Sequence, residues 1–341
     1  MRIIKYISIT ILTIALFLIF SKQEKTGYVI LHGETMGTFY NIKIRQEEQQ
    51  IPSDLQDRID KELAEINRQM SVFIEDSEIN QINKLRHGKE LHISQEMTDL
   101  LLSAQEIHQE SRGLFDPTTA PLIELWGFGV QDITKLPTKQ KIAQTLKHIG
   151  LSKLKINKDK QTISKQDSLL SLNLSAIAKG YGVDRIAKLL DDMEINNYIV
   201  EIGGEIRCRG TRTKSGEKWH ISLTAPIGNG EGTAYVLDLS DISVATSGNY
   251  RNYHQSGDKR LSHTISPLTG QPIDNQMVSA TIIAPNCMEA DAYATAMMLL
   301  GPKEGLQLAE RKKLGAILMT QDADGKIKKY VSTQAKQYIR Q

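Results

Sequence analysis

The feature that most restricts the fold of this chain is the irregular order in which helical and strand-like periods follow one another. Residues 28–45 alternate between two faces on either side of a turn, which predicts a pair of strands. Residues 55–70 repeat apolar side chains at steps of three and four, which predicts an amphipathic helix, and Ser53 with Gln56 fits a capping box at its start. Similar patterns predict helices at about 95–113, 138–149, 175–193, 287–299 and 303–313, and strands at 154–157, 162–164, 169–173, 197–202, 205–209, 218–224, 234–239, 243–246, 315–320 and 327–331.

Because these helices and strands do not alternate regularly, the pattern predicts an α+β fold with mixed, largely antiparallel sheets and packed helices. It argues against a doubly wound parallel sheet. No low-complexity linker divides residues 23–341, so we expect one folded unit there, built as a single body or as two lobes.

Composition excludes several classes of protein. The chain has 341 residues, of which 24% are charged, and its net charge is +2 with Lys and Arg spread along its length. This gives no indication of a nucleic-acid partner. Cys208 and Cys287 are the only cysteines, so a Cys-rich zinc cluster and a disulfide framework are both excluded. They form either one disulfide or, as we expect, two separate buried thiols.

The first residues have the pattern of an export signal. Arg2 and Lys5 precede an uncharged, mostly apolar run from Ile7 to Phe20, and Lys22 follows it. The residues after Phe20 make a poor cleavage site, so we expect residues 1–22 to be an uncleaved membrane anchor. A cleaved signal peptide and a buried N-terminal helix are the alternatives. The remaining residues are then expected on the periplasmic side of the inner membrane.

Familiar nucleotide-binding and hydrolase motifs are absent from the sequence. It contains no G-x-x-x-x-G-K-[ST], no G-x-G-x-x-G between a strand and a helix, no H-E-x-x-H and no G-x-S-x-G. The chemistry must therefore be sought in residues that lie in unusual local environments.

Asp291 and Thr295 are two such residues, because both fall on the apolar side of the helix expected at 287–299. Positions i and i+4 lie one above the other on a helix, so the two oxygen groups form half of a site for a hard cation such as Mg²⁺. The alternative is a structural pair in which the Thr hydroxyl donates to a buried carboxylate.

Two further candidates lie near junctions between elements. Lys179 falls one turn into the helix expected at 175–193, whose free N–H groups favour an anion such as phosphate. The alternative is that a serine caps this helix and Lys179 is an ordinary solvent-exposed lysine. His263 is the best of the eight histidines as a base, because small and polar residues surround it, and a structural role fits it equally well. The aromatic and glycine-rich loop at 113–129 suits either a flat ligand ring or a plug of the core.

Eight stretches resemble, in this order, blocks of the ApbE family, the FAD:protein FMN transferases. They are "GETMGTFY", "MSVFIEDSEIN", "GLFDPTTAPLIELWGFG", "LSAIAKGYGVDRIA", "EIGGEIRCRG", "VATSGNYRNY", "SHTISPLTGQP" and "APNCMEADAYATAMMLLG", and together they span about residues 33–320. Each block alone is weak, and eight in sequence are specific.

The resemblance implies a T-fold-like α+β catalytic unit over residues 23–341 and a transferase reaction. Members of the family take FAD as substrate and use a divalent metal, usually Mg²⁺ with Mn²⁺ as the alternative. They attach the FMN half to a Ser or Thr hydroxyl of another protein and release AMP. The recipients are subunits of quinone reductases, of Rnf-type complexes or of other exported flavin reductases. Two other functions fit the same residues: a metal-dependent FAD pyrophosphatase giving FMN and AMP, and an exported FAD-binding protein without catalysis.

The resemblance also implies roles for individual residues. Asp291 and Thr295 are expected to bind the metal through their side chains and Ala176 through its backbone carbonyl, while His263 helps to deprotonate the acceptor hydroxyl. The residues expected to contact FAD are Met36, Phe73, Leu114, Phe115, Asp116, Asn173, Lys179 and Ile265.

Three positions depart from the family pattern. Asn173 stands where members often have Asp, which removes one acidic contact. Ser266 replaces the Asp of the common "HTIDP", which weakens the expected support of His263. Phe73 takes a place that Tyr often holds, which keeps a ring for stacking and loses a hydroxyl.

Overall fold

The structure, a computed structural model, describes residues 27–46, 51–128, 136–227, 230–249, 253–256, 259–322 and 324–340. The expected anchor at 1–22 lies outside these residues. Within the described ranges no helix has the length and apolar character needed to cross a membrane.

An eight-stranded sheet forms the centre of the fold, and every neighbouring pair of its strands is antiparallel. This confirms the predicted fold class. The strands are, in spatial order, β1 (Tyr28–Thr35), β2 (Thr38–Arg45), β6 (Tyr198–Ile202), β7 (Glu205–Arg209), β10 (Ile242–Gly248), β13 (Met277–Ala284), β14 (Gly315–Gln321) and β15 (Ile327–Val331).

Smaller sheets and the helices surround this centre. One small sheet has the order β3 (Glu90–His92), β5 (Thr162–Lys165) and β4 (Leu154–Asn157), and two ribbons pair β8 (Trp219–Ile227) with β9 (Gly230–Leu239) and β11 (Tyr253–Ser256) with β12 (Lys259–Ser262). The α-helices are α2 (Leu55–Met70), α3 (Glu78–Lys84), α4 (Gln95–Glu110), α5 (Ala120–Leu125), α6 (Lys139–Leu146), α7 (Ala178–Asp192) and α8 (Cys287–Lys312), and the 3₁₀ helices are η1 (Pro117–Thr119), η2 (Leu151–Lys153) and η3 (Gln334–Tyr338).

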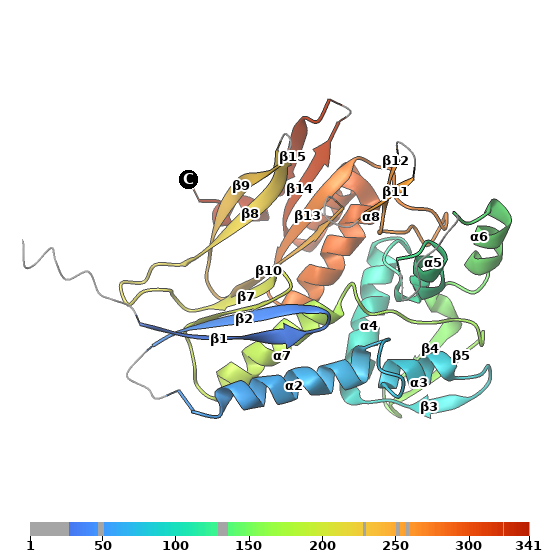
Figure 1. Ribbon diagram of the computed structural model, residues 1–341, viewed down its shortest axis with the longest axis horizontal. Coiled ribbons are helices and arrows are strands. Elements are labelled where there is room, and N and C mark those ends of the chain that lie inside the picture. Colours follow the sequence, from blue (N-terminus) through green and yellow to red (C-terminus); the bar gives the residue numbers. More distant parts are fainter. Residues whose placement is uncertain are drawn as a thin grey trace, which may run out of the picture.

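Both faces of the central strands are covered. Along β14, Ala316 and Leu318 join the core formed with the helices, whereas Ile317 and Met319 join a second core under the β8–β9 ribbon. This is the period of two expected of a strand, with apolar residues on both sides. In Figure 1, α2, α7 and α8 lie along one side of the large sheet, and α3–α6 gather with the small sheet at one end of the molecule.

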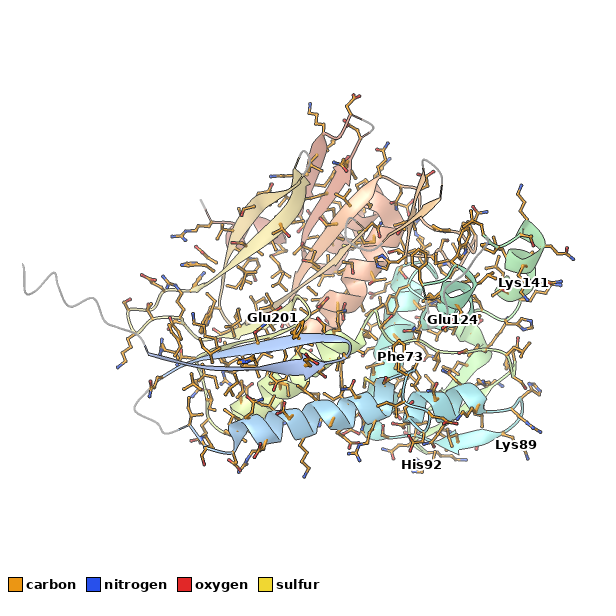
Figure 2. All side chains as sticks on the ribbon, in the orientation of Figure 1. Phe73, Lys89, His92, Glu124, Lys141 and Glu201 are labelled. Carbon is orange, nitrogen blue, oxygen red and sulfur yellow. The ribbon has the colours of Figure 1, made fainter. Side chains whose placement is uncertain are left out.

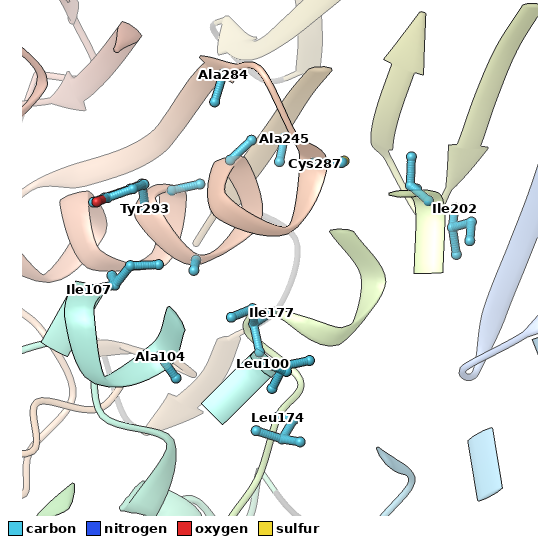
Figure 3. Close-up of a cluster of buried hydrophobic side chains, with 14 of the residues drawn as sticks. Leu100, Ala104, Ile107, Leu174, Ile177, Ile202, Ala245, Ala284, Cys287 and Tyr293 are labelled. Carbon is cyan, nitrogen blue, oxygen red and sulfur yellow. The ribbon is translucent and has the colours of Figure 1, made fainter. Parts of the chain in front are cut away.

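The main core continues from the sheet into the helical end of the molecule. Figure 3 shows side chains of α4 (Leu100, Ile107), of the segment before α7 (Leu174, Ile177) and of α8 (Cys287) in one buried cluster. Each of these side chains is at most 2% exposed. Burying an aliphatic side chain of this size stabilises a fold by about 1.5–3 kcal/mol, so this cluster fixes how α4, α7 and α8 pack.

Some local predictions were wrong. The capping box at Ser53 is not formed: α2 starts at Leu55 with Asp54 as its N-cap, and Gln56 donates to the Tyr40 hydroxyl and to Asp60 Oδ2. The helix expected from Ser175 starts two to three residues later, at Ala178. By contrast, the two helices expected at 287–299 and 303–313 are confirmed: they are the two parts of α8, which is interrupted at Gly301, with a φ of 78°, just before Pro302. Both cysteines are free and buried, as expected.

The strand expected at 169–173 is also absent, because side chains satisfy the backbone of this segment in place of a neighbouring strand. Buried Lys165 donates to the carbonyls of Asn83 and Leu170, at 2.8 Å each. The Asn83 side chain accepts from Leu172 N–H (2.7 Å) and donates to Leu172 C=O (3.1 Å). These bonds fix the irregular segment that leads into α7.

We expect Gly180→Ala to destabilise the protein, because α7 and α8 touch at this glycine. A Cβ there would lie 2.2 Å from the carbonyl oxygen of Cys287, a backbone atom that cannot move alone. The loss should be about 2 kcal/mol, as for other overpacked sites. Gly182→Ala is the matched control: it gains the same helix propensity, and its Cβ meets only the movable ends of Met36 and Ile202. Thermal unfolding followed by circular dichroism measures both, and equal melting temperatures would contradict the prediction.

Candidate active site

A cavity of about 570 Å³ lies where α7 and α8 meet the ends of β7 and β10, and this size suits a small-molecule ligand. The β8 strand and the loop between α4 and η1 complete its wall. Its charged and potentially charged lining residues in the described ranges are Asp116, Lys179, Glu205, His263 and Asp291.

Asp291 is the most deeply placed charge in this cavity. It lies on the first turns of α8 and is 2% exposed. Its Oδ2 accepts the backbone N–H of Gly180 at 3.0 Å, in the first turn of α7. A carboxylate is stabilised at a helix N-terminus by the free N–H groups and the helix dipole. The close approach that Gly180 allows therefore fixes one oxygen of Asp291 and leaves Oδ1 free of this bond.

Lys179 connects Asp291 to a second buried carboxylate. Its Nζ lies 3.5 Å from Asp291 Oδ1 and 3.3 Å from Oε1 of Glu205, which is 3% exposed. Glu205 starts β7 directly after a turn at Gly203 and Gly204, both with positive φ, and the Lys179 stem packs against Gly203. The Oε2 atom of Glu205 is buried without a hydrogen-bond partner among the described residues.

Burial and charge act in opposite directions on these groups. Burial alone would lower the pKa of Lys179, but the negative charges of Asp291 and Glu205 outweigh it and hold this pKa above its ordinary value. Burial raises the pKa of Glu205 to about 8, and the charge of Lys179 only partly offsets this. The cluster therefore keeps a charged ammonium ion in the wall of the cavity.

The oxygen groups near Asp291 suit a hard cation. Thr295 lines the cavity one turn after Asp291, and its hydroxyl lies 3.1 Å from Ser247 Oγ. The alternative in which Thr295 pairs with Asp291 is not seen; the carboxylate bonds to α7 instead. Within the described ranges no group of three His, Cys, Asp or Glu residues could hold a metal. One carboxylate, a hydroxyl and the Ala176 segment fit Mg²⁺, which often joins proteins through one or two carboxylates plus substrate phosphates.

His263 also lines the cavity. Its ring contacts Phe128 edge to face, with 6.4 Å between the ring centroids. Ser266 does not lie among the cavity-lining residues; its hydroxyl accepts the Thr269 N–H in a turn. His263 thus faces the same space as Asp291 and Lys179, from an element far away in the sequence.

Most of the predicted site residues meet at this cavity, and two do not. Met36 lies in the turn between β1 and β2 and packs against Gly182, and Phe73, which follows α2, is 76% exposed (Figure 2). Neither lines the cavity, so their expected contacts with FAD stay predictions. The predicted residues that do line it are Leu114, Phe115, Asp116, Asn173, Ala176, Lys179, His263, Ile265, Asp291 and Thr295.

The loop at 114–116 forms part of the cavity wall, and the side chains of Phe115 and Asp116 are held within the protein. Phe115 is 2% exposed and belongs to the main core, as the alternative of a core plug predicted. Asp116 uses its oxygens within the protein, where Oδ1 accepts from Thr118 N–H (2.8 Å) and Oδ2 from Leu151 N–H (3.2 Å). The loop is therefore a fixed surface for a ligand to lie against.

With this geometry established, comparison with known proteins identifies the family. The model of the ApbE family matches residues 36–318 of the chain. This chain belongs to the ApbE family. It is similar to proteins named FAD:protein FMN transferase from Vibrio cholerae (36% identity, 95% of this chain and 97% of the relative), Haemophilus influenzae (34%, 90% and 90%) and Escherichia coli K12 (31%, 94% and 91%).

Solved structures agree with the fold. The flavin transferase ApbE from Vibrio cholerae superposes with a TM-score of 0.85 at 36% identity, covering 92% of this chain and 99% of that one. The apo form of the Pseudomonas stutzeri flavinyl transferase ApbE gives a TM-score of 0.83 at 29% identity, with 92% and 97% covered.

Within this ApbE-family chain, Glu205 is a residue of the cavity that the sequence did not single out. Glu205 falls in the quoted block "EIGGEIRCRG". The alternation of a strand predicts which face a residue is on, but it does not predict that the first residue of β7 contacts Lys179 of α7. The pair of glycines before it was the available signal, because consecutive glycines often bring a backbone close to another group.

The pKa of Glu205 predicts a specific dependence of stability on pH. Because this pKa is raised in the folded state, the folded protein holds the proton more tightly than the unfolded chain. The contribution to stability is present below pH 4.5 and is lost as the pH rises towards about 8. We expect the melting temperature of Glu205→Gln, relative to wild type, to increase across this window in metal-free buffer with EDTA.

Glu201→Gln serves as the control, since it removes a carboxylate from the same β6–β7 hairpin (Figure 2). Parallel pH profiles for wild type and Glu205→Gln would show that Glu205 is not buried in this manner.

Proposed function

We propose that this chain is a flavin transferase that moves the FMN half of FAD to a Ser or Thr hydroxyl of an acceptor protein. The acceptor oxygen attacks the phosphorus of the FMN half and forms a phosphoester bond. The bond between this phosphorus and the bridging oxygen breaks, and AMP leaves. The observation that carries the proposal is one cavity, in an ApbE-family chain, that holds Lys179, Asp291 and Thr295 together with His263.

Side chains of the cavity supply what such a transfer needs. The hydroxyl proton passes to an imidazole nitrogen of His263 as the new bond forms, and general-base help of this kind is worth about 10²–10⁴-fold. The ammonium group of Lys179 stabilises negative charge on the diphosphate. The fixed loop at 114–116 and Ile265 hold the rest of FAD in place, which favours an in-line approach.

A divalent metal, Mg²⁺ or Mn²⁺, would be held by the side chains of Asp291 and Thr295 and by the Ala176 carbonyl. When bound it would neutralise charge on the diphosphate. The oxygen-only donor set supports this assignment, and so does the depth of Asp291 in the cavity, where its carboxylate already pairs with one cation, the Lys179 ammonium.

The location and the partners of the reaction are part of the proposal. Residues 1–22 would anchor the chain in the inner membrane, with residues 23–341 as the transferase domain on the periplasmic side. Their charge pattern supports this, with Arg2 and Lys5 before the apolar run. Acceptors would be subunits of quinone reductases, of Rnf-type complexes or of other exported flavin reductases.

One assay separates transfer from the two alternative functions. Purified protein is mixed with FAD, Mg²⁺ and a candidate acceptor, and flavin fluorescence is followed on a denaturing gel while nucleotides are quantified by chromatography. Transfer gives a fluorescent acceptor band and one AMP per label. FMN and AMP without a labelled band would identify a pyrophosphatase, and unchanged FAD would identify a carrier.

Asp291→Asn should reduce metal-dependent turnover by at least about 100-fold, since it removes the one carboxylate expected to bind the metal. The amide keeps the shape of the side chain and its acceptor for Gly180, so the fold is retained. Turnover is measured as AMP release over a range of Mg²⁺ concentrations. Wild-type rates at every concentration would refute the metal assignment.

His263→Asn should slow transfer by about 10²–10⁴-fold while FAD affinity changes little, because the imidazole acts on the acceptor hydroxyl. Single-turnover transfer rates and titration of flavin fluorescence measure the two quantities. A proportional loss of FAD affinity would instead assign His263 to substrate binding.

A further inference from the structure

Lys179 occupies the position where a cation bound to Asp291 would act. Gly180 N–H donates to Asp291 Oδ2, and the other oxygen, Oδ1, lies 3.5 Å from the lysine ammonium. A divalent cation on Asp291 and the ammonium group would repel each other strongly in a buried site. The lysine must therefore move away from Asp291 when a metal binds.

Glu205 is the carboxylate that is placed to bind the Lys179 ammonium group after this movement. Its Oε1 already lies 3.3 Å from the ammonium, and its Oε2 is buried without a hydrogen-bond partner among the described residues. Such an orphan acceptor is costly unless another state of the protein uses it. Glu205 is also fixed in space, because its backbone pairs with Ile202 across the β6–β7 hairpin.

The path between the two carboxylates is short. Lys179 belongs to the first turn of α7, whose position is set by the contact of Gly180 with α8. Its stem packs against Gly203 and its ammonium lies 3.3 Å from Glu205 Oε1, so rotation about the last side-chain bonds would carry the ammonium from Asp291 towards Glu205 Oε2.

We propose that Glu205 is a positioning residue that takes over Lys179 from Asp291 when a divalent cation binds. The lysine acts as a built-in counter-ion of the metal-free site and then stays in the cavity wall, beside the phosphates of a bound dinucleotide. This inference rests on the proposed function only in placing the cation at Asp291. It predicts that Glu205 influences metal affinity through Lys179, without binding the metal itself.

Binding of Mn²⁺ alone to the purified full-length protein tests the proposal at about pH 8.5, where Glu205, with its pKa of about 8, is a carboxylate. Free Mn²⁺ is measured by electron paramagnetic resonance with no FAD present. Lys179→Met should tighten Mn²⁺ binding about tenfold, because a competing cation is removed. Glu205→Gln should weaken it about tenfold, because the lysine then has no carboxylate to move to. Glu201→Gln, from the same hairpin, should bind as wild type does.

The double variant decides between an indirect and a direct role. In the Lys179→Met background, Glu205→Gln should have less than about a third of its effect in the wild-type background. Equal effects in both backgrounds would mean that Glu205 acts on the cation directly, which overturns the proposal. No effect of Glu205→Gln in the wild type, or no Mn²⁺ binding by the wild type, also overturns it.

Glu205→Asp keeps the proposal testable if Lys179→Met does not fold. It retains the charge and shortens the reach by one methylene, so it should weaken Mn²⁺ binding nearly as much as Glu205→Gln. If Glu205→Asp binds Mn²⁺ with wild-type affinity, the exact position of the carboxylate at residue 205 does not matter and the proposal is refuted. Flavin transfer by the wild type is assayed separately. If the wild type transfers flavin but the effects of Lys179→Met and Glu205→Gln on Mn²⁺ affinity are additive, only this inference is refuted. If these effects are non-additive and no flavin is transferred, only the proposed reaction is refuted.

Discussion

The contact between Gly180 of α7 and the start of α8 is the constraint on which the rest of the structure depends. A carboxylate that is 2% exposed needs partners, and the free N–H groups of a helix start supply them at little cost. They reach Asp291 because Gly180 has no side chain between the two helices. The same contact sets where the first turn of α7 lies, and thereby where Lys179 points.

The cavity forms where the two helices in contact, α7 and α8, meet strands of the large sheet. Strands such as β14 are covered on both faces. The cavity takes residues from other strands of this sheet, near the ends of those strands. Glu205 begins β7 after a glycine turn, and Ser247 lies near the end of β10. Charged groups at such places keep fixed positions and still reach solvent or a ligand.

The sequence predicted much of this, and the failures have definite causes. Asp291 and Thr295 were visible because a carboxylate and a hydroxyl broke an apolar helical period, a purely local signal. The strand expected at 169–173 failed because side chains bind its backbone groups: Lys165, just before the segment, and Asn83, far away in the sequence. Glu205 was missed for a similar reason, since its partner is in another element. The resemblance to a family supplied the order of the blocks, and only the structure shows which side chains meet.

The departures from the family pattern change charge more than shape. Asn173 Oδ1 accepts the Ser175 N–H at 2.8 Å, and Ser266 Oγ accepts the Thr269 N–H at 3.3 Å, which are bonds that an Asp could also make. Each replacement keeps a turn and loses a negative charge near the cavity. Asp116 is occupied within its loop, so Glu205 and Asp291 are the carboxylates of the described lining that face Lys179. A diphosphate entering this cavity therefore meets less repulsion than the family pattern alone would imply, and the balance of charge around Lys179 decides how tightly it is held.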